Sequence, residues 1–379
     1  MEYIPFSKPS IDQATCDEVV DCLKSGWLTT GPRTKKFEEM LSAYLHNPHV
    51  TCLTSATAGL HLALAALDFK PGDEVITSAH TFVATLNTIV IAGAKPVLVD
   101  IDLATRNMNV NLLEQAITPN TKAIMPVHIA GLPVDLDPLY ALAKKYHLRV
   151  IEDAAQAVGT DYKGKKLGSF GDTQVFSFHP NKNMTSGEGG CVSTCDETLL
   201  KKINVLKFHG IDRDAFNRYG KTGSQEYDVI EAGFKYNMLD LQAAIGLHQL
   251  PQLDTFNKLR IEKASHYLRE LKDVNALQLP GTPNFDCTHT WHVFTVLIDP
   301  RRMSRGDFMQ ALKDKNIGTG LHYQPVSLYT YYREHYGFKP GDFPQAEYCG
   351  NHIVSLPLFP DLTESQQSYV IDSIKEVLA

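Results

Sequence analysis

Short apolar runs alternate with segments of helical spacing along the first half of the chain. The runs have four or five residues and near-continuous hydrophobicity, which is typical of strands buried on both faces of a parallel sheet. Helical spacing separates several of them, as at 58–67, 111–117 and 136–146. The alternation predicts an α/β fold with a mostly parallel central sheet and helices on both faces. The predicted strands are 50–53, 74–78, 96–100, 123–127, 149–153 and 174–178.

A different pattern begins near residue 240. A long helical segment there is interrupted at Pro251, because proline removes a backbone hydrogen bond from a helix. Beyond it, WHVFTVLID and further short elements indicate a smaller α+β domain. We therefore predict a large domain with an N-terminal arm over residues 1–250 and a small C-terminal domain over 251–379. A length of 379 residues agrees with two domains.

Composition narrows the classes of function. The net charge of −7 comes without a basic stripe, which disfavours a nucleic-acid partner. No apolar stretch approaches the roughly 20 residues that cross a bilayer, and the N-terminus lacks the pattern of a secretory signal. The seven cysteines are odd in number and mostly lie in apolar context, which is typical of reduced thiols. We expect a cytoplasmic protein with no membrane partner.

Polar residues follow several predicted strands, where open α/β sheets bind ligands. The segment TSATAG, residues 54–59, opens a helix and either caps it or leaves its first N–H groups free for a phosphate. Asp153 either caps a helix or holds a carboxylate near the sheet for a buried cation. Phe82 either stacks on a ligand ring or packs in the core.

Lys182 lies in the loop segment FSFHPNKNMTSGEGG, 29 residues after Asp153 and beyond the next strand. That spacing lets the two side chains converge over one crevice. A phosphate site, a carboxylate and one loop lysine are what pyridoxal phosphate needs, since its aldehyde forms a Schiff base with lysine and its ring nitrogen stays protonated against a carboxylate. An apolar strand end beside the lysine would lower its pKa and keep part of the amine neutral.

These motifs also carry a resemblance. The segments TSATAG, TFVAT, VIEDAAQAVG, FSFHPNKN followed by GEGG, and FKYNMLDLQAAIGL resemble the DegT/DnrJ/StrS family of pyridoxal-phosphate sugar aminotransferases, which have the aspartate aminotransferase fold, fold type I. The resemblance covers nearly the whole chain. Within the family, SGWLTTGP, KFHG, IGTGLHY and SLPLFPDLTES are most similar to the UDP-4-amino-4-deoxy-L-arabinose oxoglutarate aminotransferase and its relatives that act at C4 of UDP-linked sugars.

The resemblance implies roles for individual residues. Lys182 would be the Schiff-base lysine and proton shuttle, and Asp153 would bind the pyridine nitrogen. Asn237 would reach the phosphate of the neighbouring subunit, because family active sites form at a homodimer interface. The remaining implied contacts are Gln156 beside the ring, Ala56, Thr57 and Ser177 at the phosphate, and Thr29, His322 and Tyr323 at the sugar nucleotide.

The implied reaction moves the amino group of glutamate to the C4 ketone of a UDP-linked 4-keto sugar, a pentose or a 6-deoxy hexose. The product would be an amino sugar for a surface glycan such as lipopolysaccharide. A dTDP-linked sugar or amination at C3 is the alternative. Family members that act as dehydratases carry histidine in place of the lysine, so Lys182 argues against that activity.

Three other classes are disfavoured. A pyridoxal-phosphate-sensing regulator would need a DNA-binding module, and neither a helix-turn-helix segment nor a basic patch is present. A metal enzyme would need more ligands than the pair His289 and His292, which have i, i+3 spacing without a third and fourth partner. A nicotinamide enzyme would show G-x-G-x-x-G after an early strand, and this chain does not.

Overall fold

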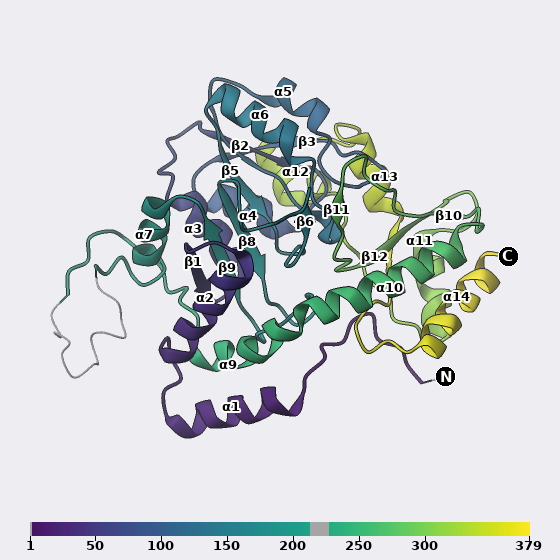
Figure 1. The fold of residues 1–379 in the computed structure, drawn as a ribbon. Coiled ribbons are helices and arrows are strands. Elements are labelled where there is room, and N and C mark those ends of the chain that lie inside the picture. The colour runs from purple at the N-terminus through teal and green to yellow at the C-terminus, as the bar shows by residue number, and fades with distance from the viewer. Residues whose placement is uncertain (1, 213–226) are drawn as a thin grey trace.

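Seven strands form the central sheet of the computed structural model, which describes residues 2–212 and 227–379 (Figure 1). Their order is β1-β9-β8-β5-β4-β2-β3. Neighbours from β8 to β3 are parallel, whereas β9 is antiparallel to both β1 and β8. The mostly parallel sheet was predicted, and the antiparallel β9 was not. The bounds are β1 (Val50–Leu53), β2 (Glu74–Ser78), β3 (Lys95–Val99), β4 (Thr121–Met125), β5 (Arg149–Asp153), β8 (Thr173–Ser177) and β9 (Gly190–Thr194).

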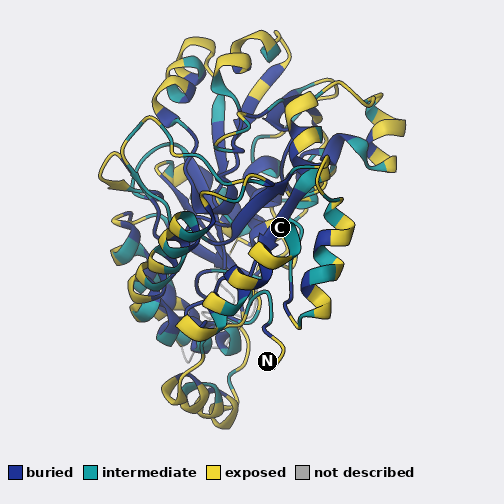
Figure 2. Cartoon of the chain, turned by 90° about the vertical axis from the view of Figure 1, so that its right-hand side faces the viewer, coloured by how far each residue is buried: buried dark blue, intermediate teal, exposed yellow. Residues whose placement is uncertain are grey.

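Helices cover both faces of this sheet. Since successive side chains of a strand point to opposite faces, Ile151 of β5 packs with the helix α3 while Val150 packs toward α6. Figure 2 shows the result, a dark-blue buried sheet between helices whose outer surfaces are exposed. One face is covered by α3 (Ala56–Ala65), α4 (Val83–Ile91) and α7 (Glu197–Leu206), and the other by α2 (Pro32–Leu45), α5 (Leu113–Ala116), α6 (Leu136–Tyr146) and α9 (Asp240–Gln249), with α1 (Gln13–Ser25) against α9.

The chain leaves this sheet through α9 and the long helix α10 (Leu253–Leu271) (Figure 1). A short 3-10 turn, Leu250–Gln252, joins them and contains Pro251, where the sequence predicts an interruption. A second, antiparallel sheet follows, with order β10-β12-β13. The strands of this sheet are β10 (Leu277–Gln278), β12 (Phe294–Ile298) and β13 (Ile353–Leu356). The helices in this part of the chain are α11 (Arg305–Asp314), α12 (Thr330–Tyr336), α13 (Pro344–His352) and α14 (Glu364–Leu378).

Two contacts join segments that lie far apart in the sequence. Ile4 forms a bridge with Ile317 and packs in the core around the second sheet, so the N-terminal residues lie with the C-terminal part. In a third, small sheet β11 (Cys287–Thr288) pairs with β6 (Asp161–Tyr162), which in turn pairs with β7 (Lys165–Lys166). The domain boundary near residue 250 stays a prediction.

Two observations complete the description. All seven cysteines are free thiols. Within residues 2–212 and 227–379, no helix is both long and apolar enough to cross a membrane.

Candidate active site

One cavity of about 440 Å³ lies where the parallel strands end. Residues that follow β1, β2, β5 and β8 line it, together with a segment from the C-terminal part of the chain. Nine of the eleven predicted site residues line this cavity, namely Ala56, Thr57, Phe82, Asp153, Gln156, Ser177, Lys182, His322 and Tyr323. The topology therefore brings together residues that lie more than 260 positions apart in the sequence.

The start of α3 forms the anion-binding end of the cavity. The Ser55 hydroxyl caps the helix by accepting a hydrogen bond from the Ala58 amide at 3.1 Å. The first amides of a helix have no acceptor inside that helix, so the N–H groups of Ala56 and Thr57 can bind an anion. A side chain on Gly190 of β9 would place its Cβ 2.6 Å from the Ala56 nitrogen, so only glycine leaves the helix start in this position. TSATAG can therefore fill both predicted roles at once, because Ser55 caps the helix while the amides of Ala56 and Thr57 stay open to an anion.

Asp153 is the last residue of β5 and its side chain is buried. Its carboxylate accepts a hydrogen bond from the Thr85 hydroxyl at 2.8 Å and another from the Ala155 amide at 3.2 Å. Burial raises the pKa of this carboxyl group, although the bond from Thr85 opposes the rise. No helix begins after Asp153 in this part of the described chain, so the alternative of a simple helix cap is wrong. The carboxylate is suited to a cationic group held in the cavity.

Lys182 lies in the loop between β8 and β9. The neighbouring Asn183 anchors the loop, because its Nδ2 donates to the Thr290 carbonyl at 2.8 Å and to Asn257 Oδ1 at 2.7 Å. The side chain of Lys182 is partly accessible from the cavity, yet the surrounding protein removes most of the water from around its amine. That burial lowers the pKa of Lys182 to about 8, although Asp153 raises it. A substantial share of the amine is therefore neutral at slightly alkaline pH.

Aromatic and amide groups form the opposite wall. Gln156 Nε2 donates to the Tyr323 hydroxyl at 2.8 Å, and Gln156 Oε1 accepts from the Ala130 amide at 2.7 Å. Phe82 is 51% exposed and its ring centroid lies 5.4 Å from that of Tyr323, so the alternative of a core aromatic is wrong. His322 Nδ1 lies 2.9 Å from the Ser355 hydroxyl.

Two predicted site residues lie outside this cavity. Asn237 lines a second cavity of about 660 Å³, where its Nδ2 donates to the Thr30 hydroxyl at 2.6 Å. Thr29 is exposed, and its carbonyl accepts a hydrogen bond from the Asp240 amide at 3.3 Å. Their predicted roles at the cofactor of the neighbouring subunit and at the sugar nucleotide stay predictions.

Sequence reasoning missed two residues at the site. Thr85 lies within the quoted segment TFVAT, but its bond to Asp153 joins positions 68 residues apart and leaves no signal in the sequence. His292 was considered only as a metal ligand, whereas its Nε2 lies 3.4 Å from the Lys182 amine. Its partner in that pair, His289, instead lies 3.0 Å from the Ala130 carbonyl through Nε2. Among the residues that the structure describes, no three His, Cys, Asp or Glu side chains are placed to hold a metal ion.

The residues present fit the predicted cofactor. Open helix amides can bind its phosphate, the carboxylate of Asp153 has no cation bound to it among the described side chains, and the amine of Lys182 is easily neutral. These three groups belong to different elements and converge on one cavity.

Comparisons with known proteins give consistent results. Residues 9–375 match the sequence model of the DegT/DnrJ/EryC1/StrS aminotransferase family. The spore coat polysaccharide biosynthesis protein SpsC of Bacillus subtilis is 42% identical over 379 residues, covering 99% of this chain and 97% of SpsC.

Two solved structures are also similar. Spr1654 of Streptococcus pneumoniae, described as a sugar aminotransferase and solved in PMP and PLP forms, superposes in its PMP form with a TM-score of 0.91 at 35% identity, over 99% of this chain and 98% of that one. PseC of Helicobacter pylori, an aminotransferase involved in the biosynthesis of pseudoaminic acid, gives a TM-score of 0.92 at 29% identity, over 100% and 99% of the two chains. The predicted family and fold class are confirmed.

Proposed function

Because the chain belongs to the DegT/DnrJ/EryC1/StrS aminotransferase family, we propose that it transfers the amino group of glutamate to the C4 ketone of a UDP-linked 4-keto sugar. It is a sugar aminotransferase that depends on pyridoxal phosphate, as is its family. The product is an amino sugar for a surface glycan, an assignment supported by the names of the similar proteins SpsC and PseC.

The observation that carries the proposal is the convergence of Lys182, Asp153 and the start of α3 on one cavity. When bound there, pyridoxal phosphate supplies the aldehyde that takes up the amino group and an electron-withdrawing ring. The Asp153 carboxylate keeps the ring nitrogen protonated. That positive charge offsets the cost of burying the carboxylate, which otherwise raises its pKa.

Lys182 is the general base and general acid of the proposed reaction. With pyridoxal phosphate bound, the amine of Lys182, whose pKa is lowered to about 8, would be neutral often enough to attach to the aldehyde with loss of water. Once the amino group of glutamate displaced it, the free amine would take a proton from the α-carbon of the donor. The same amine would then return that proton to the carbon atom that came from the aldehyde, so one side chain would act first as base and then as acid. Lys182, in the loop that joins β8 to β9, lines the same cavity as Asp153 and can make both movements there.

The UDP group contributes binding energy at a distance from the reaction. A small ketone offers few groups to recognise, and contacts to a nucleotide diphosphate can orient it over the cofactor. His322 and Tyr323, which line the far wall of the cavity, are assigned to the sugar nucleotide. The nucleotide should therefore affect the rate as well as the affinity.

The test of the substrate uses enzyme loaded with pyridoxamine phosphate. UDP- and dTDP-linked 4-keto and 3-keto sugars are offered in turn, the absorption of the cofactor is followed, and products are identified by mass spectrometry and NMR. Conversion of the cofactor with UDP-linked 4-keto sugars is the expected result. Conversion only with a 3-keto sugar, or with dTDP-linked sugars alone, would reject the substrate but leave the aminotransferase activity intact.

We also propose a homodimer in which each active site draws on both chains. Asn237 lines the second cavity rather than the first. Ile211 lines the same second cavity and pairs with Val229, an apolar residue that is exposed in the single chain. A two-fold axis would bring Asn237 to the phosphate of the partner. Mixing Lys182→Ala protein with an Asn237→Ala protein should restore activity above the sum of the two, because some dimers then hold one site with neither change. Simple additivity after verified subunit exchange would reject shared sites.

A further inference from the structure

His292 is the residue nearest to the reactive amine that no part of the proposed function uses. Its Nε2 lies 3.4 Å from Lys182 Nζ, and its ring is 2% exposed. The other ring nitrogen, Nδ1, is buried and has no hydrogen-bond partner among the described residues. A buried polar atom without a partner costs free energy, so its retention requires a reason.

The backbone around His292 is held from two sides. Its N–H donates to the Ala130 carbonyl at 2.8 Å, and its carbonyl accepts from the Arg260 guanidinium at 3.1 Å. The preceding Trp291 has φ of 46°, a left-handed conformation that is costly for a bulky residue. These contacts fix the position of the main chain from which the His292 ring reaches Lys182.

The surroundings select one protonation form of His292. Burial lowers the pKa of His292 well below its usual range, and the nearby Lys182, His322, Arg260 and His179 add to that effect. A neutral imidazole carries one N–H and one acceptor nitrogen. Since the charged form of the Lys182 amine can only donate, its hydrogen bond to the neutral ring requires Nε2 as the acceptor and places the ring proton on Nδ1. Asp153 is the carboxylate that acts on the charge of Lys182 from the other side.

We propose that His292 is a positioning residue that accepts a hydrogen bond from the free amine of Lys182 and holds it over the cofactor whenever the lysine is not covalently bound. This proposal rests on the assignment of Lys182 as the reactive lysine. The hydrogen bond fixes the direction in which the amine presents its lone pair. It also stabilises the charged amine, because bonds from charged donors are stronger than neutral ones.

The test measures the free amine directly, in enzyme loaded with pyridoxamine phosphate, where Lys182 is not linked to the cofactor. Competitive labelling with a small acylating reagent at a series of pH values, read by mass spectrometry of the Lys182 peptide, gives the pKa of the amine. His292→Leu removes the acceptor and should lower this pKa by about one unit. His292→Gln can place an acceptor oxygen near the position of Nε2 and should keep the wild-type value.

A second readout is the reaction of the pyridoxal-phosphate form with glutamate. His292→Leu should slow this half-reaction roughly ten- to hundredfold with little change in glutamate affinity, since the amine is misdirected. His289→Leu is the matched control, because His289 lies in the same segment but contacts Ala130 rather than Lys182. If His292→Leu does not fold, His292→Met takes its place.

The outcomes separate this proposal from the proposed function. An unchanged pKa of Lys182 in His292→Leu would overturn it, as would an equal shift in His289→Leu or a His292→Gln protein as impaired as His292→Leu. In each of those cases the wild-type enzyme would still convert glutamate. Failure of the wild-type enzyme to react with any amino donor would instead reject the proposed function.

Discussion

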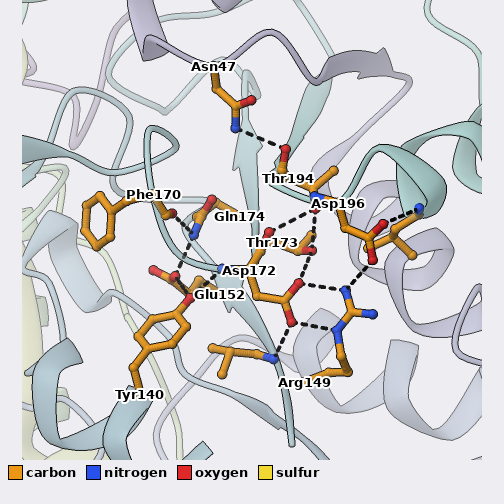
Figure 3. A network of polar contacts seen from close by, with 12 residues as sticks. Asn47, Tyr140, Arg149, Glu152, Phe170, Asp172, Thr173, Gln174, Thr194 and Asp196 are labelled. Carbon is orange, nitrogen blue, oxygen red and sulfur yellow. Dashed lines mark hydrogen bonds and ion pairs between the residues drawn. The ribbon is translucent and has the colours of Figure 1, made fainter. Parts of the chain in front are cut away.

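Glu152 and Asp153 are adjacent buried carboxylates at the end of β5, and they differ in how completely they are bonded. Glu152 points to the face covered by α6, where Tyr140 and Gln174 each donate to it at 2.6 Å (Figure 3). Asp153 points to the opposite face, where it receives one bond from the Thr85 hydroxyl and one from a backbone amide. Period-two alternation of a strand places one carboxylate in a packed layer and the other at the cavity.

A third donor completes the surroundings of Glu152. The Val134 amide donates to His128 Nδ1 at 3.1 Å, so the proton of the neutral ring is on Nε2, which lies 2.8 Å from Glu152. Tyr140 also accepts a hydrogen bond from the Asp172 amide and thereby connects Glu152 to the ion pair between Asp172 and Arg149 (Figure 3). None of the residues in this network lines the cavity that contains Lys182.

The number of hydrogen-bond donors around each carboxylate distinguishes the structural one from the functional one. Three donors stabilise Glu152, and none of them faces a ligand. Asp153 has a raised pKa and an open side toward Lys182, so its charge is stabilised fully only when a cation enters the cavity. The first carboxylate should matter for stability and the second for activity.

Asp153→Asn should have the largest effect on activity. We expect a fall of roughly 10³-fold in kcat, because the ring nitrogen of the cofactor loses the carboxylate that keeps it charged. Steady-state kinetics of the loaded enzyme measures this loss. A variant within tenfold of wild type would contradict the assignment.

The stability of cofactor-free Asp153→Asn supplies the control. Since the folded state raises the pKa of Asp153 above 3.8, the folded wild-type protein binds more protons than the unfolded protein just above that value. Its stability therefore falls as pH rises through this window, and the Asn variant lacks that contribution. Denaturant titrations at several pH values should show no loss of stability for the variant at neutral pH.

Glu152→Gln should show the reverse behaviour. In this variant an amide nitrogen, which is a donor, replaces one carboxylate oxygen and must face another donor. This mismatch should lower the free energy of unfolding by about 2–4 kcal/mol. Denaturant unfolding of the cofactor-free protein measures the loss. Activity per cofactor-loaded molecule should stay within about threefold of wild type, and a much larger fall with unchanged stability would reverse the roles of the two residues.

Thr85→Val should lower activity less than Asp153→Asn does, because it removes only one hydrogen bond to the carboxylate. Removing one hydroxyl donor raises the pKa of Asp153 further and should reduce kcat about five- to tenfold. Thr88→Val is the matched control, because Thr88 is also buried in α4 but bonds the Thr85 carbonyl at 3.0 Å rather than Asp153. Equal effects of the two substitutions would mean that helix packing, not the bond to Asp153, is responsible.

Much of this arrangement is predictable from the sequence because strand ends are visible in it. The apolar runs ending at Leu53 and Asp153 predict β1 and β5 to the residue, and the parallel sheet then requires Asp153 and Lys182 to meet at one edge. The direction of the pKa shift of Lys182 is also predicted, and burial of the amine is its cause.

Other features depend on contacts that no local pattern records. Thr85 and His292 reach the site from segments 68 and 110 positions away from their partners. The strand β9 follows the glycine cluster and was not predicted from the sequence. Asn237 was placed at a cofactor by resemblance, and one chain alone leaves it in a separate cavity.

We assign covalent attachment of the cofactor to Lys182. Reduction of the pyridoxal-phosphate-loaded protein with borohydride makes such a link permanent, and digestion followed by mass spectrometry locates it. We predict a pyridoxyl group on the peptide that contains Lys182, and none on the corresponding peptide of Lys182→Ala. A pyridoxyl group on a different lysine, with the Lys182 peptide unmodified, would contradict the account.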